Sequence, residues 1–234
     1  MIIFAVDSAG KTAGAALLRD DTVLFEEMLH TGFTHSQTLL PLADKAFSAC
    51  GLCAADTQLF CVTIGPGSFT GLRIGLALVK GMAFPFDTPS VGVSTLEALA
   101  AGYPGEGTLL CAQDARRGEV YWALFEKTAA GVRRLGPDAA SPVKTALDSA
   151  KSAKKPLILL GDGAALCYNM LEDKTCALLA PSQHNRPALG AALAGRAAAL
   201  RGEALSAAAL QPQYLRLSQA ERERANKLEK EKLI

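Results

Sequence analysis

One pattern of residues occurs twice in this chain and limits the folds that it can adopt. Residues 2–6 form an apolar run that ends at Asp7, and after a short turn the chain returns as a second apolar run over 13–18. The same order of apolar run, aspartate, turn and returning run begins at residue 109, with its aspartate at Asp114. Apolar runs of this length between turn residues are typical of buried β-strands. We therefore expect a β-hairpin in each half of the chain, with an acid at the end of its first strand.

The spacing of apolar side chains predicts the remaining elements. Recurrence every three and four residues is typical of amphipathic helices, and short continuous apolar runs are typical of buried strands. In the order strand-strand-strand-helix-strand-helix-strand-helix, the first half is expected to form elements over residues 2–6, 13–18, 22–29, 36–50, 58–64, 69–84, 89–93 and 95–101. The second half is expected to form strands over 109–114, 119–125, 131–135 and 157–160, and helices over 142–153 and 188–201.

A loop at 102–107 that is rich in glycine divides these elements into two groups. We therefore predict an α/β protein with two lobes, 1–103 and 104–234, each a mixed βββαβα sheet with helices. The charged segment 218–234 is expected to be helical and to pack back on the first lobe. Two such lobes are similar to the RNase H-like, actin-like (ASKHA) fold of actin, Hsp70 and hexokinase. In that fold, two facing hairpin turns hold the phosphates of a nucleotide.

Composition narrows the class of protein further. Half of the 234 residues are hydrophobic, so the chain can bury a core without a metal or a disulfide to stabilise it. The 24 basic and 23 acidic residues leave a formal charge of +1, which gives no overall field to attract nucleic acid. No apolar run is long enough to span a membrane, and the first residues lack the basic region of a signal peptide. We therefore expect a cytoplasmic protein with no membrane partner.

Two turns and one loop carry residues that can contact a nucleotide. A hairpin turn with an acid, a hydroxyl and an ammonium group can meet phosphate or Mg²⁺, and a Gly-Asp-Gly turn can approach a nucleotide closely. The candidates are Asp7, Ser8, Lys11, Asp114, Gly161, Asp162 and Gly163. The alternative is that these are plain turns, with Asp7 bonded to its own backbone. Gly10-Lys11-Thr12 does not end a P-loop, because the glycine required five residues earlier is missing and a strand follows.

The segment GPGSFTG at 65–71 joins a predicted strand to the helix over 69–84. Its glycine spacing differs from the dinucleotide pattern GxGxxG, so a tight turn capped by Ser68 is the simpler interpretation. The helix that follows has apolar side chains in every direction around its axis, and such a helix must be covered on all sides. One side can lie on the sheet, and the rest needs either the helix over 36–50 or another chain.

Residues for metal binding or nucleophilic catalysis are few. His30, His35 and His184 form no metal-binding motif, and no G-x-S-x-G motif occurs. Cys50 and Cys53 form a CxxC pair, but the pair ends a helical stretch instead of opening one, and no second CxxC occurs. We predict no metal site and no catalytic residue in this chain.

Six segments together resemble the TsaB (YeaZ) family. They are IFAVDS at 3–8, HSQTLLP at 35–41, GPGSFTGLRIG at 65–75, GVSTL at 92–96, DARRGEVY at 114–121 and PQYLR at 212–216. The match runs from residue 2 to about 216, and 65–75 and 114–121 are its most specific parts. The resemblance implies a two-lobed actin-like fold with a decayed nucleotide cleft. It also implies kinship with TsaD and the glycoprotease family named after it.

The resemblance implies a function and partners. A member of this family would be a non-catalytic scaffold that binds and activates TsaD, which transfers a threonylcarbamoyl group to the adenosine next to the tRNA anticodon. A TsaE ATPase would join the pair, and contact with tRNA would be indirect. No cofactor would be bound by this chain itself, although ATP or ADP would fit at the interface with the partner. Nothing in the resemblance implies peptide cleavage.

The same resemblance points to a surface for TsaD on the helices over 36–50 and 69–84. The candidate contacts are His35, Leu39, Leu42, Phe47, Leu72, Arg73, Leu76 and Lys80. Without TsaD, an apolar surface of this kind would pair with itself to form a homodimer.

Two other functions stay open on the residues alone. A small-molecule kinase with the actin-like fold would use Asp7 and Asp114 to hold Mg²⁺ and to take a proton from the acceptor. The chain is short, however, for two lobes and a substrate-specific insertion. A metallopeptidase would need metal ligands that this sequence does not offer.

Overall fold

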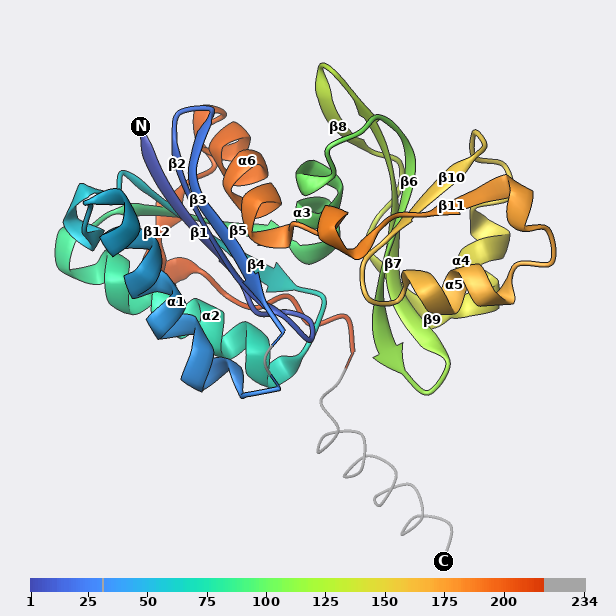
Figure 1. The fold of residues 1–234 in the computed structure, drawn as a ribbon, viewed down its shortest axis with the longest axis horizontal. Helices are drawn as coiled ribbons and strands as arrows, with labels where there is room; N and C mark the ends of the chain where they lie inside the picture. The colour runs from blue at the N-terminus through green and yellow to red at the C-terminus, as the bar shows by residue number, and fades with distance from the viewer. Residues whose placement is uncertain (31, 217–234) are drawn as a thin grey trace, which may run out of the picture.

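The computed structural model describes residues 1–30 and 32–216, which form two lobes, each built on one β-sheet (Figure 1). The strands follow the order β12-β5-β4-β1-β2-β3 in the first sheet and β11-β10-β6-β7-β8 in the second, where β9 also pairs with β7. Both sheets contain parallel and antiparallel pairs. The predicted α/β fold with two mixed sheets is confirmed.

The first sheet is centred on β1. Its strands are β1 (Ile2–Asp7), β2 (Ala13–Arg19), β3 (Thr22–Leu29), β4 (Leu59–Gly65), β5 (Pro89–Ser94) and β12 (Leu205–Ser206). β1 pairs antiparallel with β2 and parallel with β4. Because helices cover both faces of the sheet, the β1 residues Ile3, Phe4, Ala5 and Val6 are fully buried. A strand buried on both faces has a continuous apolar run instead of an alternating one.

The second sheet has β6 and β7 at its centre. Its strands are β6 (Gly107–Arg116), β7 (Glu119–Thr128), β8 (Gly131–Arg134), β9 (Ala139–Pro142), β10 (Leu157–Leu160) and β11 (Ala177–Leu179). β6 pairs antiparallel with β7 and parallel with β10, as β1 does with β2 and β4. Asp7 and Asp114 therefore occupy corresponding places near the ends of β1 and β6.

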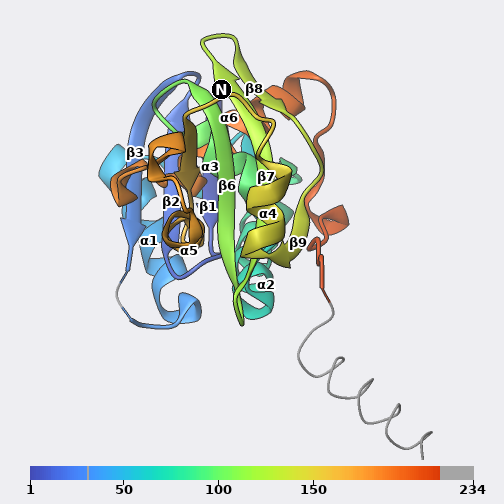
Figure 2. The same ribbon diagram turned by 90° about the vertical axis from the view of Figure 1, so that its right-hand side faces the viewer.

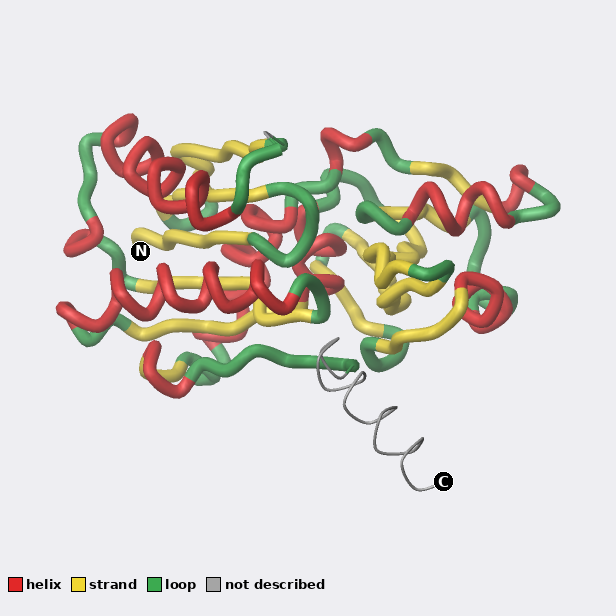
Figure 3. The backbone as a smooth tube through the Cα atoms, turned by 90° about the horizontal axis from the view of Figure 1, so that it is seen from below, coloured by secondary structure: helices red, strands yellow, loops and turns green. Residues whose placement is uncertain are grey.

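Helices form three layers around the two sheets. They are α1 (His35–Cys50), α2 (Phe69–Ala83), α3 (Thr95–Gly102), α4 (Val143–Ser149), α5 (Ala164–Met170) and α6 (Pro187–Leu200). α1 and α2 lie side by side on one face of the first sheet (Figure 3). α6 covers the other face and packs against α3, which lies on the second sheet (Figure 1). α4 and α5 cover the opposite face of the second sheet (Figure 2).

The predicted boundary of the second lobe is wrong. We expected 104–234 to form one lobe, but residues 187–210 return to the first lobe, where α6 packs on β1, β2, β4 and β5 and β12 pairs with β5. The helix fits between the sheets because it is rich in alanine and glycine: a Cβ on Gly190 would lie 1.7 Å from the carbonyl oxygen of Ala98. The segment 218–234, predicted to pack on the first lobe, lies outside the described residues.

Most predicted elements are present, and the errors fall in the second half. The order of the eight elements predicted before residue 102 is confirmed. The helix predicted over 142–153 is shorter, because α4 ends at Ser149. β9, β11, β12 and α5 were not predicted, since segments of four, three, two and seven residues are too short to display a period.

α2 is covered on one side by its own chain. By length and composition alone, the stretch Phe69–Phe86 could cross a membrane. In the fold, this stretch is α2 with a short 3₁₀ turn, and it packs on β4, β1 and α1. Leu72 and Val79 are fully buried, whereas Phe84 at the end of the helix is exposed. Of the two neighbours considered for this helix, α1 of the same chain covers one side. Part of the surface of α2 remains uncovered.

Three glycines of the 65–75 segment allow α2 to touch the turn that follows β1. A Cβ on Gly71 would lie 2.0 Å from the carbonyl oxygen of Ser8, and one on Gly75 would lie 2.5 Å from the Ser8 hydroxyl. A Cβ on Gly67 would lie 2.6 Å from the carbonyl oxygen of Ala9. Separations this short cannot be tolerated. The glycines are therefore required for the start of α2 to pack against the turn.

We expect Gly71→Ala to destabilise the protein, because the added methyl group must push the backbone of Ser8 away. The free energy of unfolding should fall by about 1–3 kcal/mol, the usual cost of overpacking. Gly81 provides a matched control on the same helix, since a Cβ there would meet nothing within 4 Å. Gly81→Ala should raise stability by about 0.5–1 kcal/mol through helix propensity. Urea unfolding of both variants tests the contact, and equal effects would contradict it.

Candidate functional site: the cleft between the lobes

The hairpin turns after β1 and β6 face each other across a cleft. Two cavities occupy it, one of about 360 Å³ and one of about 530 Å³. Both are lined by Gly10, Lys11, Gln113 and Asp162. The smaller cavity extends toward the loop after β10 and the start of α6, and the larger one extends toward the start of α2. The cleft therefore brings together residues from both lobes, as the repeated hairpin predicted.

Asp7 lines the smaller cavity and is only 1% exposed. Its Oδ1 accepts a hydrogen bond from the Thr63 hydroxyl at 2.6 Å and another from the backbone N–H of Ala9 at 3.3 Å. Burial raises the pKa of Asp7 to about 6, although these two hydrogen bonds oppose the shift. The bond to Ala9 is the backbone contact that the plain-turn alternative predicted, so Asp7 both shapes its turn and lines the cavity.

The turn after β1 is held by the helices behind it. The Ser8 hydroxyl donates to the carbonyl oxygen of Gly71 at 2.8 Å, and the N–H of Ser68 donates to the carbonyl oxygen of Ala9 at 2.8 Å. The Nε2 atom of His35 lies 2.9 Å from the carbonyl oxygen of Gly10. Ser8, a predicted nucleotide contact, is therefore wrong for that role, because its buried hydroxyl binds α2 and lines neither cavity.

Charged groups of the two lobes meet at the middle of the cleft. The Lys11 ammonium lies 3.8 Å from Oδ2 of Asp114, and this ion pair joins the two turns. The backbone N–H of Asp114 donates to Oδ1 of Asp162 at 2.9 Å, and the N–H of Arg116 donates to Oδ1 of Asp114 at 2.8 Å. Desolvation raises the pKa of Asp162. The other three charged candidates, Lys11, Asp114 and Asp162, therefore lie together in the cleft.

The Gly-Asp-Gly loop is close-packed against β6. A Cβ on Gly161, where φ is +96°, would lie 2.1 Å from the carbonyl oxygen of Ala112. A Cβ on Gly163 would lie 2.8 Å from the carbonyl carbon of Gln113. The glycines therefore serve packing, and they bring Asp162 into the cleft.

Gln113 and Asn185 are polar residues of the cleft that were not among the predicted candidates. Gln113 is 6% exposed and lines both cavities, and Asn185 accepts a hydrogen bond from the N–H of Gly161 at 2.8 Å through its Oδ1. Gln113 stands next to the predicted acid Asp114, which is the one signal that could have drawn attention to it. Asn185 precedes α6, and its place became apparent only when α6 was seen to return to the first lobe.

Most of the predicted contacts with a partner lie in the core of the first lobe. Five of them are at most 6% exposed, namely Leu39, Leu42, Phe47, Leu72 and Leu76. Their side chains pack on the first sheet and on each other, so these five assignments are wrong. When a helix is apolar on all sides, its sequence does not reveal which of its side chains the sheet of the same lobe will cover. The other three, His35, Arg73 and Lys80, are partly or fully exposed.

Arg73 and Lys80 contact the last described segment of the chain, residues 208–216, here called the C-terminal strap. Arg73 Nε donates to the Tyr214 hydroxyl at 2.9 Å, and the Lys80 ammonium donates to the carbonyl oxygen of Ala208 at 3.1 Å. The Tyr214 ring stacks on Phe69 at a centroid distance of 4.2 Å. The strap therefore lies along α2.

Beyond Tyr214 the strap reaches the second lobe. Arg216 donates to the carbonyl oxygen of Ala115 at 3.0 Å and forms an ion pair with Glu119. Its guanidinium also lies 5.6 Å from the centre of the Tyr121 ring. The PQYLR segment, part of the family resemblance, thus connects α2 with the hairpin that carries Asp114.

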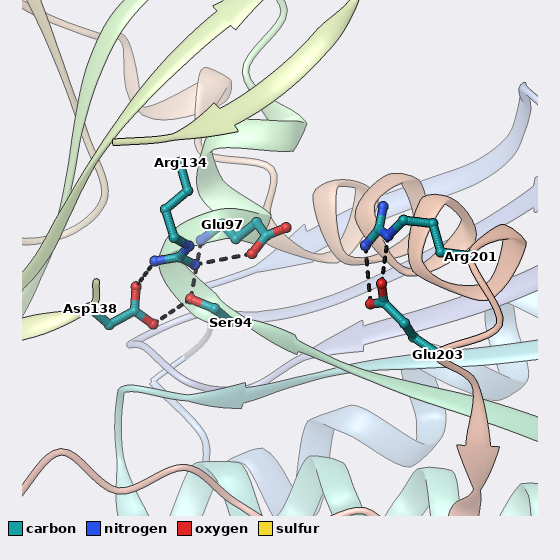
Figure 4. A network of polar contacts seen from close by, with 6 residues as sticks. All are labelled: Ser94, Glu97, Arg134, Asp138, Arg201 and Glu203. Carbon is teal, nitrogen blue, oxygen red and sulfur yellow. Dashed lines mark hydrogen bonds and ion pairs between the residues drawn. The ribbon is translucent and has the colours of Figure 1, made fainter. Parts of the chain in front are cut away.

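A second polar network connects the lobes through α3 (Figure 4). Arg134 of β8 donates to Glu97 at 3.0 Å and also bonds to Asp138. Asp138 accepts a hydrogen bond from the Ser94 hydroxyl at 2.7 Å, at the start of α3. Arg201 and Glu203 form a separate ion pair beside this network. Together with the strap, these contacts link the first lobe to the second at two places.

Among residues 1–30 and 32–216, no group of three or more histidine, cysteine or acidic side chains is arranged to bind a metal ion. All six cysteines are free thiols. Cys50 and Cys53 lie on either side of Gly51, which ends α1 in a left-handed conformation with φ of +63°. The predicted position of the CxxC pair at a helix end is confirmed.

We expect Asp7→Asn to stabilise the protein at neutral pH. Because the pKa of Asp7 is raised from 3.8 to about 6, the native state holds a proton that the unfolded state has lost, and stability falls as pH rises through this window. The effect has a ceiling of about 3 kcal/mol at 1.36 kcal/mol per unit. The gain from Asp7→Asn should therefore be small at pH 4 and largest above pH 7. Urea unfolding across this range checks it, with exposed Asp44→Asn as control; a gain that shrinks as pH rises would refute it.

Comparison with known proteins shows which family this chain resembles. A family model described as TsaD, tRNA N6-adenosine threonylcarbamoyltransferase, matches residues 31–223. The tRNA threonylcarbamoyladenosine biosynthesis protein TsaB of Bacillus subtilis is 34% identical over 225 residues, which cover 94% of this chain and 96% of that protein. TsaB of Escherichia coli is 37% identical over 135 residues, covering 56% of this chain and 58% of that protein.

Solved structures agree with the sequence comparisons. YeaZ from Pseudomonas aeruginosa superposes with a TM-score of 0.75 at 27% identity and covers 92% of this chain and 99% of its own. Component A of the (R)-2-hydroxyglutaryl-CoA dehydratase of Acidaminococcus fermentans has a TM-score of 0.55 at 10% identity over 86% of this chain and 99% of its own, which shows a shared fold. The expected two-lobed actin-like fold is confirmed. The chain belongs to the TsaB family of tRNA threonylcarbamoyladenosine biosynthesis proteins and carries the TsaD-like domain of the wider family.

Proposed function

We propose that this chain is a non-catalytic subunit that binds and activates a TsaD-like protein through α1 and α2. In this role it supports transfer of a threonylcarbamoyl group to the adenosine next to the tRNA anticodon. Membership of the TsaB family supports the pathway. The binding surface is inferred from one observation: several apolar side chains of α1 and α2 are not covered by the rest of the chain.

These incompletely buried side chains, here called the α1–α2 patch, come from α1, α2 and the turn after α2. Leu40 on α1 is 61% exposed, and Phe84, which follows α2, is 81% exposed. Ile74, Leu78 and Met82 on α2 are partly buried and touch the core beneath them. Exposed apolar side chains grouped on helices are typical of a protein–protein interface. The α1–α2 patch therefore replaces the five buried leucine and phenylalanine residues as the candidate contact surface.

Other partners follow from the same proposal. A TsaE-like ATPase would join the pair, ATP or ADP would lie at the interface with the partner, and tRNA would be contacted indirectly. Without the TsaD-like protein, the α1–α2 patch would pair with a second copy to form a homodimer. We place the complex in the cytoplasm, where its tRNA substrate is found. Kinase activity is less well supported, because the chain is short for two lobes and a substrate-specific insertion.

We expect Leu40→Glu to abolish co-purification with the TsaD-like protein of the same organism. The new carboxylate would have to be buried at the interface, while in the free chain it would remain in water. Leu200→Glu is the matched control, since Leu200 is 72% exposed and ends α6 on the opposite face of the first sheet. Pull-down with purified proteins is the measurement, and circular dichroism checks that both variants fold.

Normal binding by Leu40→Glu and by a second variant, Leu78→Glu, would show that the α1–α2 patch is not the binding surface. Substitutions of the buried residues are unsuitable for this test. Leu39 and Leu76 are 1% and 5% exposed, so a glutamate at either position would unfold the lobe.

A further inference from the structure

The smaller cavity of the cleft is lined by both apolar and polar side chains. Its apolar walls come from both lobes and consist of Met28, Leu99, Leu179, Ala180 and Pro187. Its polar lining includes the side chains of Asp7, Gln113, Asp162 and Asn185. A volume of about 360 Å³ is within the range of sites for small organic molecules. The cavity can therefore hold a ligand with an apolar body and one polar end.

Gln113 indicates what the polar end must supply. It is 6% exposed, and its Oε1 has no hydrogen-bond donor among the described residues. A buried carbonyl oxygen without a donor is unfavourable, and nearly all such groups in native proteins are satisfied. Because Gln113 lines the cavity, a ligand N–H or O–H placed there would satisfy it.

The charged side chains around the cavity determine which charge a ligand should carry. Two carboxyl groups line it, on Asp7 and Asp162, together with Gln113. The basic residues that line it are Lys11 and His30, and the Lys11 ammonium is 3.8 Å from the carboxylate of Asp114. A phosphate group would bring more negative charge next to these carboxyl groups, and like charges repel strongly at short range. A cation would instead find three oxygen acceptors.

We propose that the smaller cavity binds a small organic amine in its protonated form, with the ammonium group donating to Gln113, Asp7 and Asp162 and the apolar body against Leu99 and Leu179. The same residues disfavour the polyphosphate of a nucleotide. The cavity shares no lining residue with the α1–α2 patch. Ligand binding and partner binding can therefore be tested separately.

The probe is a matched pair of compounds, cyclohexylammonium chloride and cyclohexanol. They share one ring, and only the first carries a positive charge with N–H donors. Binding to the full-length chain is followed by protein NMR at pH 7.5, with separate titrations of MgCl₂ and of ATP with MgCl₂. We expect saturable shifts with the amine in residues of the cavity, and at least tenfold weaker binding of cyclohexanol.

Three variants locate the site. Asp162→Asn removes a charge but keeps an oxygen that can accept from the backbone of Asp114, and Gln113→Leu removes the buried acceptor. Each should weaken amine binding about tenfold or more, as expected when a charge-assisted hydrogen bond is lost. Asp148→Asn on α4 is the control for charge alone and should leave the affinity unchanged. The spectrum of each free variant establishes that it is folded.

Several results would overturn the proposal. Equal affinity for amine and alcohol would show that the cavity recognises only the ring. Saturation of the same resonances by Mg²⁺ alone, or tighter binding of ATP with Mg²⁺ than of the amine, would assign the acids to metal or nucleotide binding. Amine affinity that is unchanged in both Asp162→Asn and Gln113→Leu would place the amine elsewhere.

Discussion

The contact between the turn after β1 and the start of α2 determines how the rest of this molecule is arranged. Gly67, Gly71 and Gly75 allow the helix to approach the turn, and the Ser8 hydroxyl and the Ser68 N–H bond the two together. The turn and the start of α2 also line the cleft, and α2 carries part of the α1–α2 patch. A single close contact thus sets the geometry of both surfaces to which we assign a function.

The position of the second lobe depends on elements that are distant in sequence. α6 returns from the second lobe to cover the first sheet, and it packs against α3. The C-terminal strap then runs along α2 and reaches the hairpin after β6 through Arg216. The ion pair between Lys11 and Asp114 joins the two turns directly. Exposed ion pairs contribute little stability, so the apolar packing of α6 is the main link between the lobes.

The sequence predicts local structure well, because a continuous apolar run or a three- and four-residue spacing depends only on neighbours in the chain. β1 and α2 are examples, and the acids at the ends of β1 and β6 were also found. Tertiary relations were harder to predict. Leu72 and Leu78 lie on the same apolar helix, but only the fold reveals that the first is buried and the second partly exposed. Nothing local indicates that α6 joins the first sheet, and only the neighbouring Asp114 points to Gln113.

The central claim is that this chain supports a modification reaction without taking part in its chemistry. Reconstituted formation of threonylcarbamoyladenosine in tRNA tests it directly, with the TsaD-like and TsaE-like proteins present and this chain omitted, added, or added as Asp7→Asn. We expect the product to form only when the chain is present, and at the same rate with Asp7→Asn as with the natural protein. Full activity without the chain, or its complete loss with folded Asp7→Asn, would contradict the account.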